Sequence, residues 1–403
     1  MKKIVYLRNP IQHYAWGDTK AIAGLLGDPA ASPKPQAELW MGAHPKAPSL
    51  ARTNGDWVAL DKLIEADPRG ILGEKIAARF HNRLPYLFKV LAAAKPLSIQ
   101  AHPDRHQARE GFQRENSRGI QLNAPHRNYK DDNHKPECIC ALTPFWALCR
   151  FRHVAEIRKF LRILSPNQLA PRLEGCDQRP DRLVLRDFFE NLASMETTGK
   201  KRIIEEALIK ADKLKNENPA YAWMVALAHD YPDDFGILSP VMLNLIQLKP
   251  GQALCLPAGE LHAYLKGLGI ELMANSDNVL RGGLTAKHVD VTELLRVLTF
   301  RTGPMKVLAG ETVSDLERIY RCPAEEFQLS VLTLKEPGAY TSAAARSAEI
   351  ILCGQGKALI SDYESGDRIT LNQGQSVLIP AAVSRYGLTG KGICYKAAVR
   401  DVP

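Results

Sequence analysis

The segment Tyr129–Glu137, YKDDNHKPE, concentrates groups that can transfer protons or bind a metal ion. It contains three carboxylates, one imidazole and two ammonium groups within nine residues. Pro136 fixes its own φ and disfavours α geometry at Lys135, so the run is expected to end in extended backbone. A solvated turn has a similar composition, but the segment leads into the apolar run Cys138–Cys149, which predicts buried strands. Glu137 is therefore expected at the mouth of a sheet, where rigid elements hold functional groups in place.

A second polar pattern precedes this segment. Ser98, Gln100 and His102 alternate with apolar residues in KPLSIQAHPDRH. In a strand, residues two apart share a face, so these three polar side chains are expected to point the same way. Gln100 and His102 can then contact the same bound ion or molecule. A lone histidine in a strand is more often a hydrogen-bonded structural residue than a ligand, and the pattern alone leaves that alternative open.

A repeated frame occurs in the second half of the chain. GQALCLPAGELH runs from Gly251 to His262, and GQSVLIPAAVSR runs from Gly374 to Arg385. Both contain proline six residues after the first glycine, but the second copy has alanine in place of a glycine and arginine in place of the histidine. A duplicated β-barrel explains this, with one copy that carries the chemistry and one that is structural.

The elements that must position these groups are strands and one helical block. At 403 residues the chain is long enough for two or three domains. Apolar residues recur at helical spacing between 150 and 234, where strand signals are few. Within this block, Asn218 followed by Pro219 is typical of an N-cap and a first helical position. Residues 57–80 also have helical spacing.

From about residue 236 the pattern returns to strands and turns. One short helix is expected to begin near Asp290, with Glu293 three residues later in a capping-box arrangement. Residues 305–403 predict a further all-β unit. The helical block is therefore an insert between β-rich parts.

Composition and charge narrow the class of partners. Hydrophobic residues make up 45% and charged residues 24% of the chain, as in soluble globular proteins. No apolar run is long enough to cross a membrane, and MKKIVYLRNP at the start lacks the apolar core of a signal peptide. The net charge of +9 is spread along the chain without a basic block, which favours a phosphorylated metabolite over nucleic acid.

The cysteines carry no motif of their own. No C-x-x-C pair occurs, and most of the eight cysteines lie in apolar segments. We therefore expect reduced core residues in a cytoplasmic protein, and neither a disulfide frame nor a sulfur-bound metal site.

The first copy of the repeat matches the cupin motif, which is Gly, five residues, Pro-x-Gly, two residues and His. Such a motif places an imidazole inside a jelly-roll barrel. Lys266 stands where many cupins have asparagine four residues after the histidine, and this departure does not touch the predicted ligand position.

Over nearly its whole length the chain resembles type I phosphomannose isomerase. Several long motifs of mixed polarity occur in the order found in that family. They are YAWG (Tyr14–Gly17), AELWMGAHP (Ala37–Pro45), QAH (Gln100–His102), YKDDNHKPE (Tyr129–Glu137), LPAGELHAY (Leu256–Tyr264) and NVLRGGLTAKHVD (Asn278–Asp290).

The resemblance implies a mainly β fold with an α-helical insert. Its β parts are two cupin-type jelly-roll barrels, or double-stranded β-helices, of which the second is degenerate. Residues 1–149 and 235–304 would form the catalytic cupin domain, 150–234 the helical insert domain and 305–403 the degenerate C-terminal cupin domain.

The resemblance also implies one zinc ion per chain. In that family the ion is held by residues that match Gln100, His102, Glu137 and His262. An amide oxygen, a carboxylate and two imidazoles suit zinc and leave a position for water or sugar oxygens.

The family interconverts mannose 6-phosphate and fructose 6-phosphate through a cis-enediol, and thereby links mannose use and GDP-mannose synthesis to glycolysis. The proton on C2 is weakly acidic, so the site must stabilise the enediolate and supply a base. Zinc near the substrate oxygens can act as a Lewis acid, and Arg281, which matches the family's catalytic arginine, can stabilise the developing charge.

The other expected catalytic roles rest on the same resemblance. Lys135 and His134 are candidates for proton transfer at the enediol and for ring opening, respectively. Glu271 and Asp277 are rival bases or orienting groups, and a role as plain ion-pair partners stays open for both.

Three further residues are expected to bind the substrate. Ser98 and Lys287 can bind the phosphate, because a hydroxyl and an ammonium suit a dianion. Trp16 can form a wall of the pocket, although an aromatic residue at such a position is often part of a core.

A non-catalytic sugar-binding or regulatory cupin is the alternative function. A cupin oxygenase is disfavoured, because an amide ligand such as Gln100 is unusual around iron. The partner is expected to be a small sugar phosphate, with no nucleic acid and no membrane, and the protein is expected to be a cytoplasmic monomer.

Overall fold

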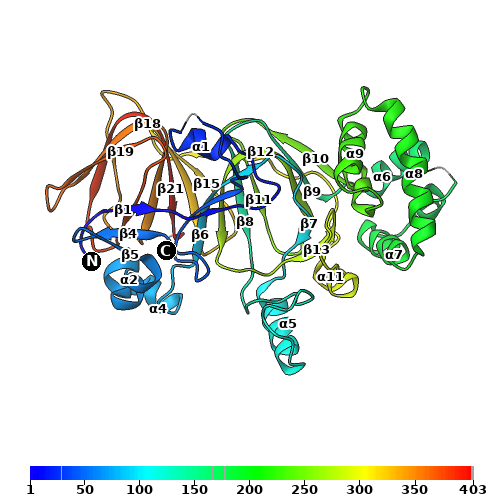
Figure 1. Cartoon of the computed structure of the whole chain (residues 1–403), viewed down its shortest axis with the longest axis horizontal. Coiled ribbons are helices and arrows are strands. Elements are labelled where there is room, and N and C mark those ends of the chain that lie inside the picture. Colours follow the sequence, from blue (N-terminus) through cyan, green and yellow to red (C-terminus); the bar gives the residue numbers. More distant parts are fainter. Residues whose placement is uncertain (29, 166, 177, 401–403) are drawn as a thin grey trace.

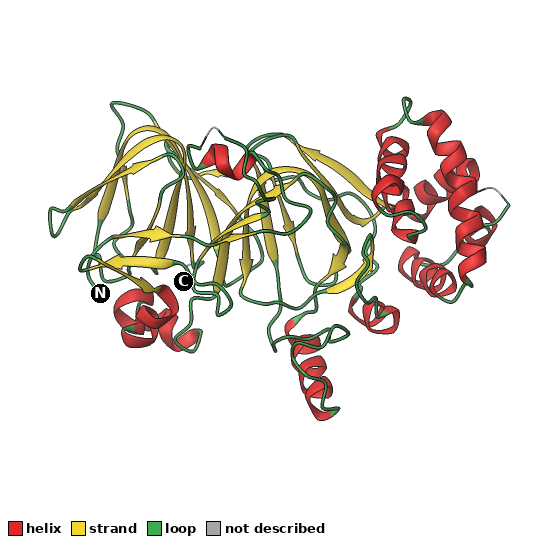
Figure 2. Ribbon diagram, viewed as in Figure 1, coloured by secondary structure: helices red, strands yellow, loops and turns green. Residues whose placement is uncertain are grey.

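Two antiparallel β-sheets, one of eleven strands and one of ten, lie side by side (Figure 1). A block of helices packs against the ten-stranded sheet at one end of the molecule (Figure 2). The structure is a computed structural model that describes residues 1–28, 30–165, 167–176 and 178–400. Among these residues, no helix has the length and apolar character needed to cross a membrane.

The ten-stranded sheet lies in the middle of the molecule and is organised around the long strand β12, which pairs with β6, β7, β8 and β9. Every residue of β6 is buried, because YLFKVLAA is apolar apart from Lys89. The strands of this sheet are β2 (Ile11–Gln12), β3 (Glu38–Met41), β6 (Tyr86–Ala93), β7 (Ile99–Ala101), β8 (Glu137–Ala141), β9 (Phe145–Phe151), β10 (Leu243–Leu248), β11 (Ala253–Leu256), β12 (His262–Ala274) and β13 (Leu280–Gly283).

The eleven-stranded sheet joins both ends of the chain. β1 pairs with β20, with Val5 opposite Leu378, and β4 and β5 extend the edge beyond β1. These N-terminal strands were expected in the first cupin domain, yet they hydrogen-bond into the sheet of residues 305–403. The strands are β1 (Val5–Arg8), β4 (Leu50–Thr53), β5 (Asp56–Ala59), β14 (Glu311–Thr312), β15 (Glu317–Tyr320), β16 (Gln328–Leu334), β17 (Tyr340–Thr341), β18 (Glu349–Asp362), β19 (Arg368–Asn372), β20 (Ser376–Ile379) and β21 (Tyr386–Ala398).

The predicted helical block and its caps are present. The side chain of Asn218 accepts a hydrogen bond from the N–H of Ala220 at 2.9 Å, and Pro219 opens the helix. Asp290 likewise accepts from the N–H of Glu293 at 3.0 Å and begins the short helix α11 (Val291–Val297). The block contains α6 (Val154–Leu164), η1 (Ala170–Leu173), α7 (Asp181–Ala193), α8 (Thr197–Leu214) and α9 (Pro219–Asp230), followed by η2 (Phe235–Leu238) and α10 (Ser239–Met242).

The helical spacing of residues 57–80 corresponds to helices over most of this range but not over its start. The segment starts as β5 and then forms three short helices, because Asp67 caps a new helix at Pro68 and Gly73 adopts a φ of 90° between the next two. The remaining helices are α1 (Ala21–Leu25), α2 (Leu60–Ala66), α3 (Pro68–Leu72), α4 (Glu74–Arg79) and α5 (Arg105–Ser117).

A shared apolar core joins the two sheets. Phe88 and Ile270 of the ten-stranded sheet belong to the same buried cluster as Leu329 and Ile350 of the eleven-stranded sheet. Burial of apolar area on both sides of this boundary stabilises the two sheets against each other.

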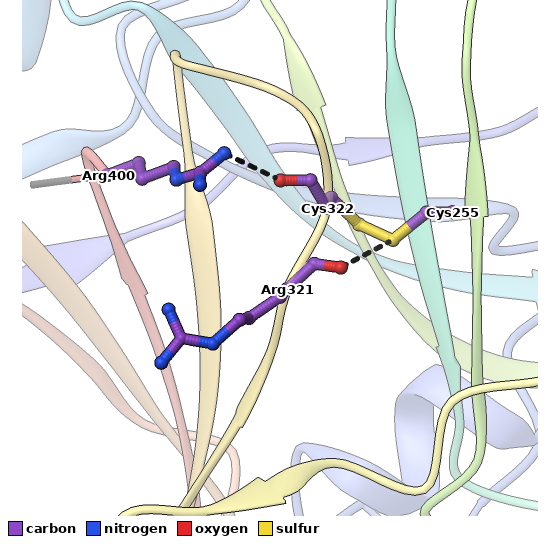
Figure 3. Close-up of a disulfide and its surroundings, with 4 residues drawn as sticks. All are labelled: Cys255, Arg321, Cys322 and Arg400. Carbon is purple, nitrogen blue, oxygen red and sulfur yellow. Dashed lines mark hydrogen bonds between the residues drawn. A yellow bond between two sulfur atoms is a disulfide. The ribbon is translucent and has the colours of Figure 1, made fainter. Parts of the chain in front are cut away.

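A disulfide crosses the same boundary. Cys255 in β11 is bonded to Cys322, which follows β15 (Figure 3). The expectation that all cysteines are reduced is therefore wrong for this pair. Their positions are 67 residues apart in the sequence, but the fold brings their Cα atoms to 5.7 Å, within the range of disulfides. The sulfur of Cys138, opposite Cys255 on β8, lies within 4.8 Å of both bonded sulfurs.

The repeated frame in the sequence corresponds to a repeated strand arrangement. Glu137 opens β8 opposite Leu256 and Met273, and Glu349 opens β18 opposite Ile379 and Ala398. Leu256 and Ile379 both lie five residues after the first glycine of their copy. Glu349 therefore occupies the place in the eleven-stranded sheet that Glu137 occupies in the ten-stranded sheet.

Buried cations surround the second of these carboxylates. The ammonium of Lys396 lies 3.8 Å from Glu349 and 2.8 Å from Glu317, and the guanidinium of Arg346 lies 3.5 Å from Glu349. The hydroxyl of Tyr386 donates a hydrogen bond to Glu349 at 2.7 Å. The charge of Glu349 is thus compensated entirely within the protein.

Replacement of Lys396 by Met is expected to destabilise the fold. The change leaves Glu349 and Glu317 without their shared cation in a buried cluster, so the free energy of unfolding should fall by about 3–5 kcal/mol in chemical denaturation. Lys391→Met, at an exposed position of the same strand, is the control. Equal stability of the two variants would contradict a need for the buried ammonium.

Candidate metal centre

Three side chains from separate parts of the ten-stranded sheet meet in one buried cluster. His102, Glu137 and His262 each offer a ligand atom, and these atoms lie within 4.8 Å of one another. Their exposed fractions are 2%, 3% and 1%. His102 follows β7, whereas Glu137 and His262 open β8 and β12, three strands that Figure 1 shows close together. The structure therefore brings together three of the four residues expected to bind zinc.

The fourth expected ligand, Gln100, lies beside this cluster. β7 pairs with β12 so that Gln100 is directly opposite His262, and with β13 so that it is directly opposite Arg281. Directly opposite residues of antiparallel strands project to the same face of the sheet. The amide, the imidazole and the guanidinium therefore share one face.

Backbone carbonyls orient the two imidazoles. Nδ1 of His102 lies 2.7 Å from the carbonyl oxygen of Asn278, and Nδ1 of His262 lies 3.0 Å from that of Glu260. A proton on each Nδ1 makes these contacts hydrogen bonds and leaves a lone pair on each Nε2. Both Nε2 atoms are buried and have no hydrogen-bond partner among the described residues, although both face the Glu137 carboxylate, at 3.2 Å from His102 and 3.5 Å from His262. This arrangement is typical of histidines that bind a metal ion.

The charges in the cluster suit a cation. Burial alone would raise the pKa of Glu137, but the Lys135 ammonium at 3.1 Å holds it well below its usual value. Burial, together with the charge of Lys135, lowers the pKa of His102 to about 4. An ionised carboxylate and a neutral imidazole are the forms that bind metal ions. The hydroxyl of Tyr264 donates to the second Glu137 oxygen at 3.3 Å.

The donor set fits zinc. Two imidazoles and one carboxylate, with the amide of Gln100 on the same face, supply the nitrogen and oxygen ligands that zinc accepts and leave a coordination position for another group. The orphaned Nε2 atoms carry this assignment, since buried polar atoms without partners are rare in proteins.

Asn278 connects the cluster to the segment Tyr129–Glu137. Its carbonyl contacts His102, and its side-chain oxygen accepts the backbone N–H of Lys130 at 2.7 Å. Its side-chain nitrogen donates to the carbonyl of Asn133 at 2.8 Å. One buried asparagine therefore fixes both a ligand and the polar segment.

Neighbouring residues of the polar segment face different partners. Lys135 lies at the metal centre, with its ammonium on Glu137. His134 instead directs Nε2 to Glu326, at 2.6 Å, and so contacts the C-terminal part of the chain rather than the ligand cluster. Extended backbone explains this, because consecutive side chains then point in opposite directions.

Arg281 and Lys287 form a pair of cations without counter-ions. Among the described residues neither makes an ion pair or a side-chain hydrogen bond. Burial lowers the pKa of Arg281, and burial together with the charge of Arg281 lowers the pKa of Lys287. Two neighbouring cations of this kind, of which Arg281 is half-buried and Lys287 exposed, favour a bound anion. Ser98 is half-buried immediately before β7.

The other predicted residues lie in ion pairs or packing contacts. Asp277 is 2.8 Å from the ammonium of Lys46 and 3.6 Å from His44. Burial alone would raise the pKa of Asp277, but these two contacts hold it well below its usual value. Burial raises the pKa of Glu271, which lies 2.9 Å from Lys89. Trp16 packs partly buried on the cluster that contains Tyr264.

Sequence reasoning missed three polar residues near the site, which are Lys89, His44 and Lys46. Lys89 is 5% exposed and lies between Glu271 and Glu38. A lysine inside the apolar run YLFKVLAA is itself a usable signal, because a buried ammonium needs a partner. His44 and Lys46 gave no such signal, since their partner Asp277 is far away in the sequence.

A cavity of about 610 Å³ lies beside the metal centre. Asp277, Lys130 and Asp131 line one side of it, and Arg105 and Glu326 line another. The four expected metal ligands are not among its lining residues. The cavity therefore adjoins the polar segment without opening directly on the ligands.

Comparison with known proteins places this site in a family. A model of the type I phosphomannose isomerase catalytic domain matches residues 4–154. Mannose-6-phosphate isomerase of Escherichia coli K12 is 39% identical over 394 residues, which cover 97% of this chain and 98% of that protein. The human mannose-6-phosphate isomerase is 34% identical over 408 residues, which cover 92% of each chain.

Solved structures agree over the full length. A phosphomannose isomerase variant from Salmonella typhimurium superposes with a TM-score of 0.89 at 37% identity, over 99% of this chain and 100% of that chain. A zinc-bound crystal structure of mannose 6-phosphate isomerase gives the same TM-score of 0.89 and the same 37% identity. With its sequence, its fold and its His–Glu–His cluster all in agreement, the chain belongs to the type I phosphomannose isomerase family.

Proposed function

We propose that this protein is a zinc-dependent aldose–ketose isomerase that interconverts mannose 6-phosphate and fructose 6-phosphate. The observation that carries the proposal is the buried cluster of His102, Glu137 and His262, in which two Nε2 atoms face the carboxylate and make no hydrogen bond among the described residues. Relatives that match over nearly the whole chain are named for this reaction. The proposal includes the cytoplasmic location and the monomeric state expected from the sequence.

The fold that we propose for this function is a pair of cupin jelly rolls, of which only the first binds metal. The repeated placement of Glu137 and Glu349 supports a duplication, and the ion pairs around Glu349 support the loss of metal binding in the second copy. The proposed parts are 1–149 with 235–304, the insert 150–234, and 305–403, with β1, β4 and β5 completing the C-terminal sheet.

Gln100, His102, Glu137 and His262 are the proposed zinc ligands. When bound, zinc supplies Lewis-acid polarisation of the substrate carbonyl and its neighbouring hydroxyl. The ligands come from the ends of β7, β8 and β12, so the rigid sheet defines where the reacting carbons lie.

Lys135 is the proposed group that moves the proton between C2 and C1. Its ammonium lies 3.1 Å from a ligand carboxylate, which places it at the reacting end of the substrate. Glu271 and Asp277 are each paired with a lysine, and we propose that they orient neighbouring groups. His134 remains the candidate for ring opening.

Arg281 and Lys287 are the proposed partners of the substrate's negative charge. Their mutual repulsion is relieved when an anion binds between them. Arg281 lies on the same face as Gln100 and His262, so it stabilises charge that develops on the enediolate. Lys287, with Ser98, binds the phosphate, and Trp16 forms a wall of the pocket.

The substitution His262→Ala is expected to remove metal and activity together, because no other buried group can replace the lost ligand. Zinc content is measured by elemental analysis, and turnover by a coupled assay on mannose 6-phosphate. Arg385→Ala, at the matching position of the second copy, should change neither. A wild-type protein that contains zinc but forms no fructose 6-phosphate would support the sugar-binding alternative instead.

The substitution Arg281→Ala is expected to leave zinc in place and to lower kcat by roughly 10²- to 10³-fold, as for loss of an oxyanion-stabilising donor. Lys287→Ala should act on KM instead, with an increase of roughly tenfold or more from the lost charged hydrogen bond. Arg301→Ala, on the exposed surface, is the control. An Arg281→Ala variant altered only in KM would assign Arg281 to the phosphate.

A further inference from the structure

A short segment of the C-terminal part, Cys322 to Phe327, reaches across to the side of the metal centre. Cys322 is bonded to Cys255 of β11 (Figure 3). Glu325 pairs with Arg79 of α4 at 2.5 Å, and Glu326 pairs with His134 of the polar segment at 2.6 Å. Three of six consecutive residues thus contact the part of the chain that contains the ligands.

The carboxylate of Glu326 is buried next to His134 and Arg105. Its exposed fraction is 1%. One oxygen lies 2.6 Å from Nε2 of His134 and 2.5 Å from the guanidinium of Arg105, while the other accepts the backbone N–H of Glu325 at 3.1 Å. Burial alone would raise the pKa of Glu326, but His134 and Arg105 hold it below its usual value. Glu326 is therefore an anion that faces the imidazole.

Nε2 of His134 faces two groups. The Glu326 carboxylate at 2.6 Å can only accept a hydrogen bond, whereas the Arg105 guanidinium at 3.0 Å can only donate one. The shorter contact, to the ionised carboxylate, favours a proton on Nε2, and the neutral ring then has its lone pair on Nδ1. In the part of the chain that the structure describes, no protein group hydrogen-bonds Nδ1 of His134. Nδ1 is therefore the nitrogen that the ring-opening step of the proposed function would use.

We propose that Glu326 is a positioning residue for His134, and that the C-terminal part thereby contributes a group to the reaction although it holds no metal ligand. The inference rests on the proposed function, in which His134 serves ring opening. Glu326 fixes the orientation of the ring and stabilises the imidazolium that forms when Nδ1 takes a proton, as carboxylates do for catalytic histidines.

The segment is anchored at two points that precede Glu326 in the sequence. The disulfide fixes Cys322 to β11, and the guanidinium of Arg400 donates to the carbonyl of Cys322 at 3.2 Å (Figure 3). Glu325 is fixed by its contact with Arg79. These contacts hold the buried carboxylate in place without help from His134.

Glu326→Gln tests the proposal, with Glu325→Gln as a matched control one residue away. The amide keeps the shape but cannot stabilise an imidazolium, so kcat should fall about 10- to 100-fold, with KM within about twofold and zinc content unchanged. Glu325→Gln removes an exposed charge and should leave kcat within about twofold of wild type. A kcat for Glu326→Gln equal to that of the control would overturn the proposal.

A double-mutant cycle separates positioning from a general structural role. In a His134→Asn background, Glu326→Gln should cause no further loss of kcat, because its effect passes through the imidazole. The same loss in both backgrounds would refute the proposal. Should Glu326→Gln fail to fold, Glu326→Asp is the second variant, because its shorter side chain keeps the negative charge but moves it away from His134. A wild-type kcat for Glu326→Asp would equally refute the proposal. A wild-type enzyme without isomerase activity would refute the proposed function instead.

Discussion

The structure depends on keeping one buried carboxylate ionised. Glu137 is almost completely excluded from water, and an isolated charge in such a place costs several kcal/mol. Lys135 and the Tyr264 hydroxyl offset part of that cost, and His102 and His262 approach the same carboxylate from other segments. The strands must therefore meet at this point for the charge to be tolerated, and the same convergence creates the donor set for a metal ion.

Much of this site could be predicted from local sequence patterns. The alternation of Gln100 and His102, the position of Glu137 before an apolar run and the spacing of His262 after proline and glycine are all visible within short windows. Partners that meet only through the fold were not predictable in this way. Glu326 follows an ordinary loop, and Cys255 and Cys322 carry no shared motif, so their contacts depend on how the two sheets pack. Among the helices, the N-caps Asn218 and Asp290 could be identified from the sequence. Helix α5 was not predicted, although Asp104 and Gln107 form a capping box at its start.

The two related carboxylates illustrate how a duplicated framework diverges. Glu137 has one ammonium, Lys135, and two imidazoles suited to a metal ion beside it, whereas Glu349 is surrounded by Lys396, Arg346 and Tyr386. Full internal compensation removes the reason to bind an ion. The change from His262 in one copy to Arg385 in the other accords with this difference, because the second copy has no use for a ligand at that position.

The pairing of β1 with β20 has a consequence for how the chain acquires its structure. β1 is synthesised long before β20, its partner in the sheet. The eleven-stranded sheet therefore cannot close during translation, and its apolar strand edges stay unpaired until the chain is nearly complete. Contacts of such long range slow folding and expose the nascent protein to aggregation, so this architecture makes early assistance by chaperones valuable.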